Sequence, residues 1–315
     1  MAEITAALVK ELRERTGVGM MDCKKALVET SGADYESSAA WLEAARDWLR
    51  AKGLSKAAKK PDRIAAEGLV GVASNGSKAA LVEVNSETDF VGRNEEFQRV
   101  VRDIAAVALE NEGDAARTLH ATLDATGTVG EVLVNLVARI GENINLRRAA
   151  ALSVSEGVVA TYIHNSVADG LGRIGVLVAL ESTADKSRLN DLGRKIAMHI
   201  AAAKPLAATT AELDPRVVEK ERAVLVEQAR ESGKAAGVIE KMVEGRLRKF
   251  YQETVLVEQA FVMDPDVTVG KFIDDHSRSL GSPVKLIGFA KFEVGEGIEK
   301  PPNDFGGDVA ALTGS

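Results

Sequence analysis

The chain has few of the residues on which several classes of protein depend. Its 315 residues include a single cysteine, Cys23, which excludes an internal disulfide and a zinc site built from several cysteines. Aromatic residues make up only 4% of the sequence, too few for a stacking platform along single-stranded nucleic acid. No run approaches the roughly 18 apolar residues that a membrane-spanning helix needs. The N-terminus carries Glu3 and begins directly with an amphipathic pattern, unlike a secretory signal. We therefore expect a soluble, cytoplasmic protein with no membrane partner.

A basic surplus is also missing. The net charge is −7, from 47 acidic and 40 basic residues, whereas a protein that neutralises many phosphates usually carries a basic stripe. One short basic cluster, Lys56, Lys59, Lys60 and Arg63, lies in an expected linker and is interpreted as a solvated face. No nucleic-acid partner is expected.

Patterns typical of catalytic and cofactor sites are absent or have the wrong setting. The four histidines are far apart in sequence, and no G-x-S-x-G nucleophile motif occurs. Cys23 is also not expected to be catalytic. Neighbouring lysines could lower the pKa of its thiol and make it reactive, but an unreactive thiol on a helix is the favoured interpretation. Residues 170–175 fit G-x-G-x-x-G, yet a strand pattern follows instead of a helix, so we expect a loop between strands. The sequence therefore predicts no catalytic residue, no metal and no cofactor.

Length and periodicity predict an α+β protein with several parts. The expected parts are a three-helix N-terminal module (1–55), a linker (56–67), a first core subdomain (68–143), a second core subdomain in two pieces (144–213 and 252–300), a protruding antiparallel helical hairpin (214–251) and a short helical C-terminal module (301–315). Small antiparallel sheets covered by helices are expected in the two core subdomains.

The expected secondary structure follows from the patterning of each segment. Asn75-Gly76 predicts a hairpin between strands at 68–73 and 78–84. Asn94 is a plausible N-cap for a helix reaching Glu110, and Thr128 with Glu131 forms a capping-box pair before another helix. Further strands are expected at 144–153, 157–163, 174–181, 254–257 and 284–294, and further helices at 186–203, 214–231, 237–251 and 268–279.

Two turns place apolar residues where a globular core does not require them. The turn between the first two helices carries Gly17, Gly19, Met20 and Met21, and methionine adapts to irregular surfaces. Composition leaves open whether these methionines bind a partner or fill the small core. The second turn joins the strand at 79–84 to the next helix and places Asp89 beside Phe90 at the rim of a domain. For a lone phenylalanine, packing onto its own core is the favoured alternative.

The sequence of the second turn, Thr88-Asp89-Phe90-Val91, resembles the signature of the elongation factor Ts family, the nucleotide exchange factors of elongation factor Tu. Four more blocks resemble the family in the same order along the chain: ITAALVKELRERTGVGMMDCKKAL at 4–27, IGENINLRR at 140–148, EKMVEGR at 240–246 and FEVGEGIEK at 292–300. A single four-residue match would be weak, but five ordered blocks extend over nearly the whole chain.

The resemblance implies a guanine nucleotide exchange factor without catalytic side chains, which binds elongation factor Tu in its GDP-bound and nucleotide-free forms. It implies that Thr88, Asp89, Phe90 and Val91 dislodge the partner's magnesium, and that the N-terminal module is ubiquitin-associated-like. The partner-binding residues that it implies are Arg13, Val18, Gly19, Met20, Met21, Asn85, His164, Asp304, Phe305 and Val309. The loop from 165 to 173, after His164, is expected to be longer than in the compact family form. Self-association through the hairpin is a further expectation.

Two other classes of function remain open from the residues alone. In one, the three-helix head binds a ubiquitin-like or nascent-chain ligand, and the chain has no exchange activity. In the other, the glycines at 170–175 bind a dinucleotide in an enzyme.

Overall fold

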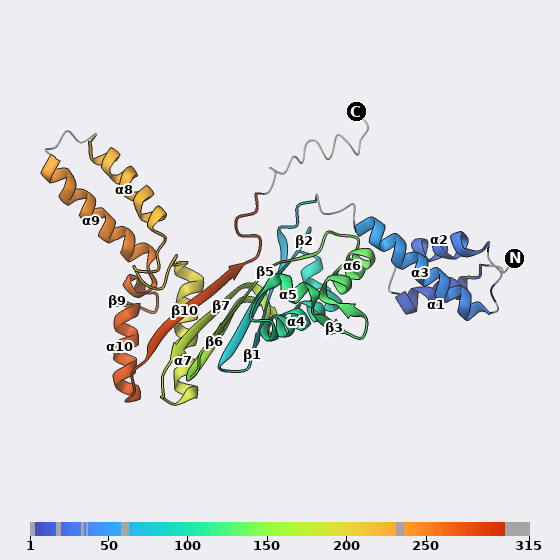
Figure 1. The fold of residues 1–315 in the computed structure, drawn as a ribbon, viewed down its shortest axis with the longest axis horizontal. Helices are drawn as coiled ribbons and strands as arrows, with labels where there is room; N and C mark the ends of the chain where they lie inside the picture. Colours follow the sequence, from blue (N-terminus) through green and yellow to red (C-terminus); the bar gives the residue numbers. More distant parts are fainter. Residues whose placement is uncertain are drawn as a thin grey trace.

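The computed structural model describes residues 4–16, 20–32, 35, 37–57, 63–230 and 236–299 (Figure 1). Its elements alternate between helices and antiparallel strands, which confirms the α+β class. The three N-terminal helices and a pair of long helices lie at opposite ends of a central sheet (Figure 1). Among the described residues, no helix is both long enough and apolar enough to cross a bilayer.

The first three helices are α1 (Ala6–Thr16), α2 (Met20–Thr30) and α3 (Ser38–Ala57), close to the predicted positions. Their apolar faces meet in one small core that includes Leu12, Leu27 and Trp41, all at most 2% exposed. The indole nitrogen of Trp41 donates a hydrogen bond of 2.9 Å to the hydroxyl oxygen of Thr30. Helix α3 extends beyond this core and packs against α6 (Val129–Ile140) (Figure 1).

The central sheet has six antiparallel strands and is larger than the small sheets that the sequence predicted. Its strands are β1 (Glu67–Ser74), β2 (Lys78–Ser86), β5 (Asn145–Ser153), β6 (Gly157–Ala168), β7 (Leu171–Glu181) and β10 (Lys285–Glu293). Strands from the two expected subdomains join at two places. Strand β2 pairs with β5 from Lys78–Ser153 to Asn85–Asn145, and β1 pairs with β7 through Val70–Gly172 and Gly71–Leu171. Glycine permits this approach, because a Cβ at Gly175 would lie 2.6 Å from Val70 Cγ1. The sequence pattern contained no sign of this pairing.

Helices α4 (Glu95–Glu110) and α6 cover the β1–β2 part of the sheet. Phe97, Ile104 and Leu136 pack with strand residues in one core and are fully buried. The predicted caps are confirmed: the Asn94 side chain accepts from Phe97 N–H, and Thr128 with Glu131 forms a capping box. Between these helices lie two elements that the sequence patterns do not predict, α5 (Ala115–His120) and the small hairpin of β3 (Thr122–Asp124) and β4 (Gly127–Thr128).

The other part of the sheet is covered by α7 (Lys186–Ala203) and α10 (Val269–Leu280), which share a core with Val178, Leu192 and Phe261. The predicted strand at 254–257 is wrong. Helix α9 (Ala236–Thr254) continues into this segment, Val255 forms one isolated bridge with Ala207, and the 3-10 helix η2 (Leu256–Glu258) follows. An apolar run this short does not distinguish a strand from the buried end of a helix. The short hairpin of β8 (Ala260–Phe261) and β9 (Asp264–Thr268) completes this side.

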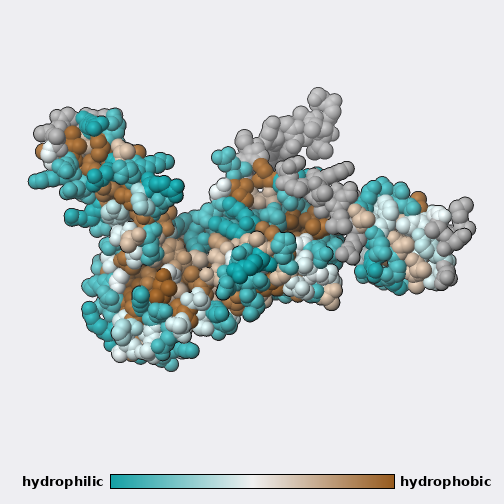
Figure 2. Space-filling view, viewed as in Figure 1, coloured by the Kyte–Doolittle hydropathy of each residue, from teal (hydrophilic) through white to brown (hydrophobic). Residues whose placement is uncertain are grey.

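Helices α8 (Pro215–Arg230) and α9 form an antiparallel pair that projects away from the sheet (Figure 1). Its own apolar seam consists of Leu225, Ala229, Val243 and Leu247. Hydrophobic residues run along the pair between hydrophilic ones in the space-filling view (Figure 2). Helix α9 extends three residues beyond the predicted end at Tyr251.

Candidate functional site

The tip, Thr88-Asp89-Phe90-Val91, follows directly after β2 and leads into the 3-10 helix η1 (Val91–Arg93). Backbone hydrogen bonds close the turn: Gly92 N–H donates to the Asp89 carbonyl at 3.2 Å, and Arg93 N–H donates to the Phe90 carbonyl at 3.1 Å. Thr88 is half-buried, and its carbonyl accepts a bond of 2.9 Å from the Ser86 hydroxyl. The tip is therefore a hydrogen-bonded turn with a defined backbone.

Phe90 and Val91 point in opposite directions. The Phe90 side chain is 71% exposed, whereas Val91 is 4% exposed and packs into the core beneath α4. The alternative in which Phe90 packs onto its own core is therefore wrong. Burying such a ring would stabilise the fold by about 1.5 to 3 kcal/mol, so its exposure leaves that free energy available to an interface. Asp89 is also exposed and lies 3.7 Å from Arg93, whose guanidinium is 6.0 Å from the centre of the Phe90 ring.

Asn85, expected at the partner surface, is fully buried. Its amide donates to the Glu67 carbonyl and to the Glu83 carboxylate, each at 3.0 Å. The side chain therefore bonds within the sheet that precedes the tip, and the structure does not place it on the same surface as Phe90.

Glu83 is a buried acid in β2 that sequence reasoning missed. Its carboxylate accepts from Gly295 N–H at 2.8 Å and pairs with Arg147 at 3.1 Å and Arg148 at 2.5 Å. Burial alone would raise the pKa of Glu83, but hydrogen bonds from Gly295, Asn85 and Arg148 hold that pKa below its usual value. The available signal was one acid inside an apolar strand together with the adjacent pair Arg147-Arg148 on another strand.

Met20 and Met21 lie at the start of α2, with exposures of 55% and 80%. They do not fill the small core, so that alternative is wrong. Arg13 is exposed on α1, while Val18 and Gly19 lie outside the described residues. Cys23 is buried, and this burial raises the pKa of its thiol, in agreement with a plain helix thiol.

His164 is exposed on β6, and its Nδ1 lies 3.0 Å from the Tyr162 hydroxyl. The expected long loop from 165 to 173 is wrong. Strand β6 continues to Ala168, and β7 begins at Leu171, so only Asp169 and Gly170 form the turn. Residues 165–168 extend the β-hairpin because the alternating pattern can continue pairing beyond His164. Asp304, Phe305 and Val309 lie outside the described residues.

His199 and the G-x-G-x-x-G match at 170–175 have structural roles and do not form a binding site. His199 is fully buried; its Nε2 lies 2.9 Å from Gln259 Oε1, and its Nδ1 accepts from Val262 N–H. Burial lowers the pKa of His199, which agrees with the predicted core histidine. Two glycines of the G-x-G-x-x-G match, Gly172 and Gly175, are inside β7, so the motif does not open a helix as a dinucleotide site requires. Over the described ranges, no group of three or more histidine, cysteine or acidic side chains could hold a metal.

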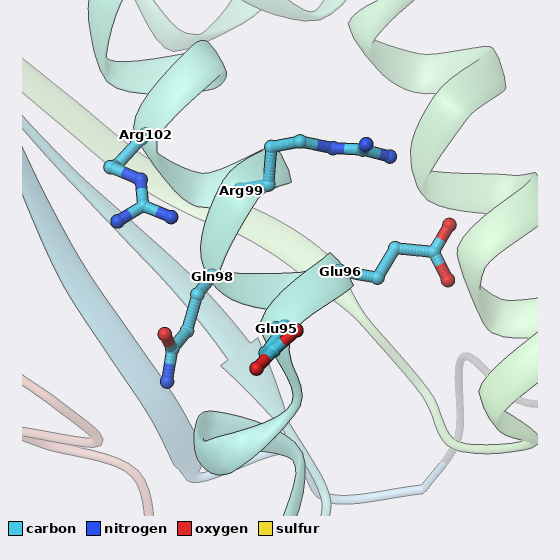
Figure 3. A pocket seen from close by; sticks show the side chains of 5 residues that line it. All are labelled: Glu95, Glu96, Gln98, Arg99 and Arg102. Carbon is cyan, nitrogen blue, oxygen red and sulfur yellow. The ribbon is translucent and has the colours of Figure 1, made fainter.

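An open hollow of about 690 Å³ lies beside α4. It is lined by Glu95, Glu96, Gln98, Arg99 and Arg102. Figure 3 shows these side chains spreading outward from one helix, with Glu96 and Arg99 on one side and Gln98 and Arg102 on the other. A phosphate site needs converging donors, whereas this set diverges and mixes both signs of charge. The hollow therefore adds no small-molecule site to the tip.

Comparison with known proteins gives one consistent family. Residues 87–296 match the family described as "Elongation factor TS". The chain is 56% identical over 312 residues to the protein named "Elongation factor Ts" from Rhizobium etli (strain CIAT 652), with 99% of each chain covered. The proteins of the same name from Caulobacter vibrioides (strain ATCC 19089 / CIP 103742 / CB 15) and Parvibaculum lavamentivorans (strain DS-1 / DSM 13023 / NCIMB 13966) are 57% and 55% identical, and the alignments cover at least 99% of each chain. The chain therefore belongs to the elongation factor Ts family, the non-catalytic nucleotide exchange factors of elongation factor Tu.

Proposed function

We propose that this chain releases GDP from elongation factor Tu by inserting Phe90 as a wedge beside the magnesium and phosphate region. The observation that carries the proposal is the 71% exposure of Phe90 on a turn closed by its own backbone hydrogen bonds. Exposed apolar rings on rigid supports are efficient anchors, because binding orders little that was mobile.

The wedge acts on the partner through packing and charge. Magnesium and the backbone around the phosphates hold GDP by many aligned contacts, and packed interiors shift between discrete arrangements when a ring is forced in. Asp89 adds a carboxylate that competes for donors near the metal. Val91, anchored in the core, and Thr88, half-buried at the base, hold the two exposed residues outward.

Contacts away from the tip provide affinity. The exposed Arg13, Met20 and Met21 would contact the nucleotide domain from the ubiquitin-associated-like module, together with Val18 and Gly19. His164 would contact a second partner domain from the first strand of the lengthened β6–β7 hairpin, and Asp304, Phe305 and Val309 would add a C-terminal contact. Asn85 contributes as support rather than as a contact, since its side chain is buried.

The finer organisation belongs to the same proposal. The parts are the three-helix module (1–55), the two core subdomains joined by the shared sheet and the protruding hairpin (214–251). The segment 301–315, predicted from the sequence as a short helical C-terminal module, lies outside the described residues. The protein would act in the cytoplasm, where its partner works, and the hairpin would provide a surface for self-association.

Linkage sets the order of events. If the factor weakens GDP binding by some ratio, GDP weakens factor binding by the same ratio. The complex with nucleotide-free partner is then the tightest, and an incoming GTP helps to expel the factor.

The test is release of a fluorescent GDP analogue from elongation factor Tu by the full chain and by Phe90→Ala and Asp89→Ala. Val224→Ala, which trims an exposed apolar residue on α8, is the matched control. We expect both tip variants to be slow and the control to match the unmodified protein. Absence of acceleration by the unmodified protein would disprove exchange activity and favour a simple binding module, whereas tip variants as fast as the unmodified protein would disprove the wedge.

A further inference from the structure

The base of the tip and the turn after α6 exchange carboxylate contacts. The Glu142 carboxylate accepts two hydrogen bonds from Thr88, from its backbone N–H at 2.9 Å and from its hydroxyl at 2.6 Å. In the opposite direction, the Glu87 carboxylate accepts from Asn143 N–H at 2.6 Å. Each segment thus supplies one acid and one backbone donor to the other.

Glu142 is mounted on a rigid part of the core. It follows Gly141, which ends α6 in the left-handed conformation with φ of 89°, a backbone that favours glycine. The preceding helix buries Leu136 and Val137 in the same core that holds Val91. An ion pair between Arg139 and Glu96 joins the last turn of α6 to the first turn of α4.

The same junction holds the chain that arrives from the N-terminal helices. Arg63 pairs with Glu87 at 3.3 Å, and the Asn143 side-chain amide donates to the Arg63 carbonyl at 2.8 Å. Three segments that are distant in sequence, at 63, 87–88 and 142–143, therefore meet directly below Asp89 and Phe90.

These contacts set the direction of the tip. Phe90 is largely exposed, so its own side chain is not oriented by the core. Its direction depends on Val91, which is anchored in the core on one side, and on the backbone at Thr88, where the chain leaves the sheet, on the other. Two charge-assisted bonds to the two oxygens of one carboxylate fix orientation as well as distance. A small rotation at Thr88 would move the ring at the end of the turn, and misplacement by about 1 Å costs a positioned group much of its effect.

We infer that Glu142 is a positioning residue for nucleotide exchange, which holds Thr88 so that Phe90 and Asp89 project in the direction required for insertion. The inference rests on the proposed function of the tip. It assigns to Glu142 a role through Thr88 and no contact with the partner.

Two measurements test this role separately. The first is amide hydrogen exchange of the isolated factor over the peptide spanning 84–94, compared among the unmodified protein, Glu142→Ala, Glu142→Gln and the control Glu110→Gln at the exposed end of α4. We expect exchange in this peptide to accelerate at least about tenfold in Glu142→Ala, less in the isosteric Glu142→Gln, and not in the control. Peptides from the β6–β7 hairpin should be unchanged, which separates loss of the tip from global unfolding.

The second measurement is fluorescent GDP release from elongation factor Tu as a function of factor concentration. In Glu142→Ala the maximal release rate should fall about tenfold, whereas the half-saturating concentration should change much less, because the remote contacts are intact. Combining Glu142→Ala with Thr88→Val should cost less than the product of the two single losses, because the hydroxyl bond that Thr88→Val removes is one of the two bonds that Glu142→Ala removes.

The outcomes separate this inference from the function on which it rests. Unchanged hydrogen exchange at 84–94 in Glu142→Ala would overturn the positioning role. Accelerated hydrogen exchange with an unchanged maximal rate would also overturn it, provided that Phe90→Ala is slow in the same assay. If Phe90→Ala were as fast as the unmodified protein, the failure would instead belong to the proposed wedge.

Discussion

The tip follows a strand of the central sheet and the α8–α9 hairpin projects from that sheet, yet different forces shape the two segments. The hairpin buries an apolar seam that includes Leu225 and Leu247, and its polar residues face outward. The tip shows the reverse arrangement, with an exposed Phe90 above a base of carboxylates and their donors. Apolar burial is strong but non-directional, whereas hydrogen bonds to carboxylates fix direction. A segment that must aim one ring outward therefore depends on the polar arrangement.

The largest effect is expected at Glu83, the buried acid of β2, the strand that leads into the tip. Replacing Glu83 by alanine leaves Arg147 and Arg148 without their buried acid, and breaking such a pair costs about 3 to 5 kcal/mol. The free energy of unfolding should fall by this amount in urea titrations monitored by circular dichroism. A loss below about 1 kcal/mol would mean that the polar support matters less than the apolar core.

The same residue gives a pH dependence with a defined sign. The folded-state pKa of Glu83 is depressed below its ordinary value of 4.5, so its stabilising contribution is present above that pH and is lost as the pH falls through the folded pKa. Unfolding free energies measured from pH 7 to pH 3 should decline below about 4.5 in the unmodified protein. Because Glu83→Gln has no charge to lose at this position, its decline should be shallower, and parallel curves for the two proteins would contradict the assignment.

In the hairpin, Leu247→Ala removes part of the apolar seam and should cost about 2 to 5 kcal/mol of local stability. Hydrogen exchange in peptides from α8 and α9 should accelerate, while the peptide spanning 84–94 keeps its protection. GDP release should remain close to that of the unmodified factor, since the tip is intact. A large loss of exchange activity would show that the two protrusions act together.

Phe90→Ala should have the opposite effect to Leu247→Ala, with a loss of exchange activity and little change in stability. An interface anchor of this kind is worth about 2 kcal/mol or more, so the maximal rate of GDP release should fall about thirtyfold. The free energy of unfolding should stay within about 0.5 kcal/mol of the unmodified value, because the ring has little contact to lose. Marked destabilisation would show that the ring packs onto its own chain in solution.

The smallest effect is expected at the exposed Met21. Met21→Ala should raise the half-saturating concentration of the factor about threefold without changing the maximal GDP release rate, as for a peripheral contact. Val28→Ala, an exposed apolar residue further along α2, is the matched control. A lower maximal rate in Met21→Ala would contradict a role in affinity alone.

Much of the fold was available from local patterns. The bounds of α7 at 186–203 match the prediction, as do the Asn94 cap and the Thr128–Glu131 capping box, because these features depend on neighbours within a few residues. The prediction of a strand at 254–257 is wrong because a short apolar run fits a strand and the buried end of a helix equally well. The prediction of a loop after His164 is wrong because the turn-forming residues there are accommodated inside the paired strands β6 and β7.

The sequence by itself determined the family, the order of the elements and the presence of an acid beside an aromatic ring in a strand-to-helix turn. Only the tertiary structure decided that Phe90 is exposed, that Asn85 and Glu83 are buried and hydrogen-bonded to each other, and that Glu142 reaches Thr88 across 54 residues. Local patterns record which residues can form a turn, but the direction of a side chain depends on partners that folding brings from distant positions in the chain.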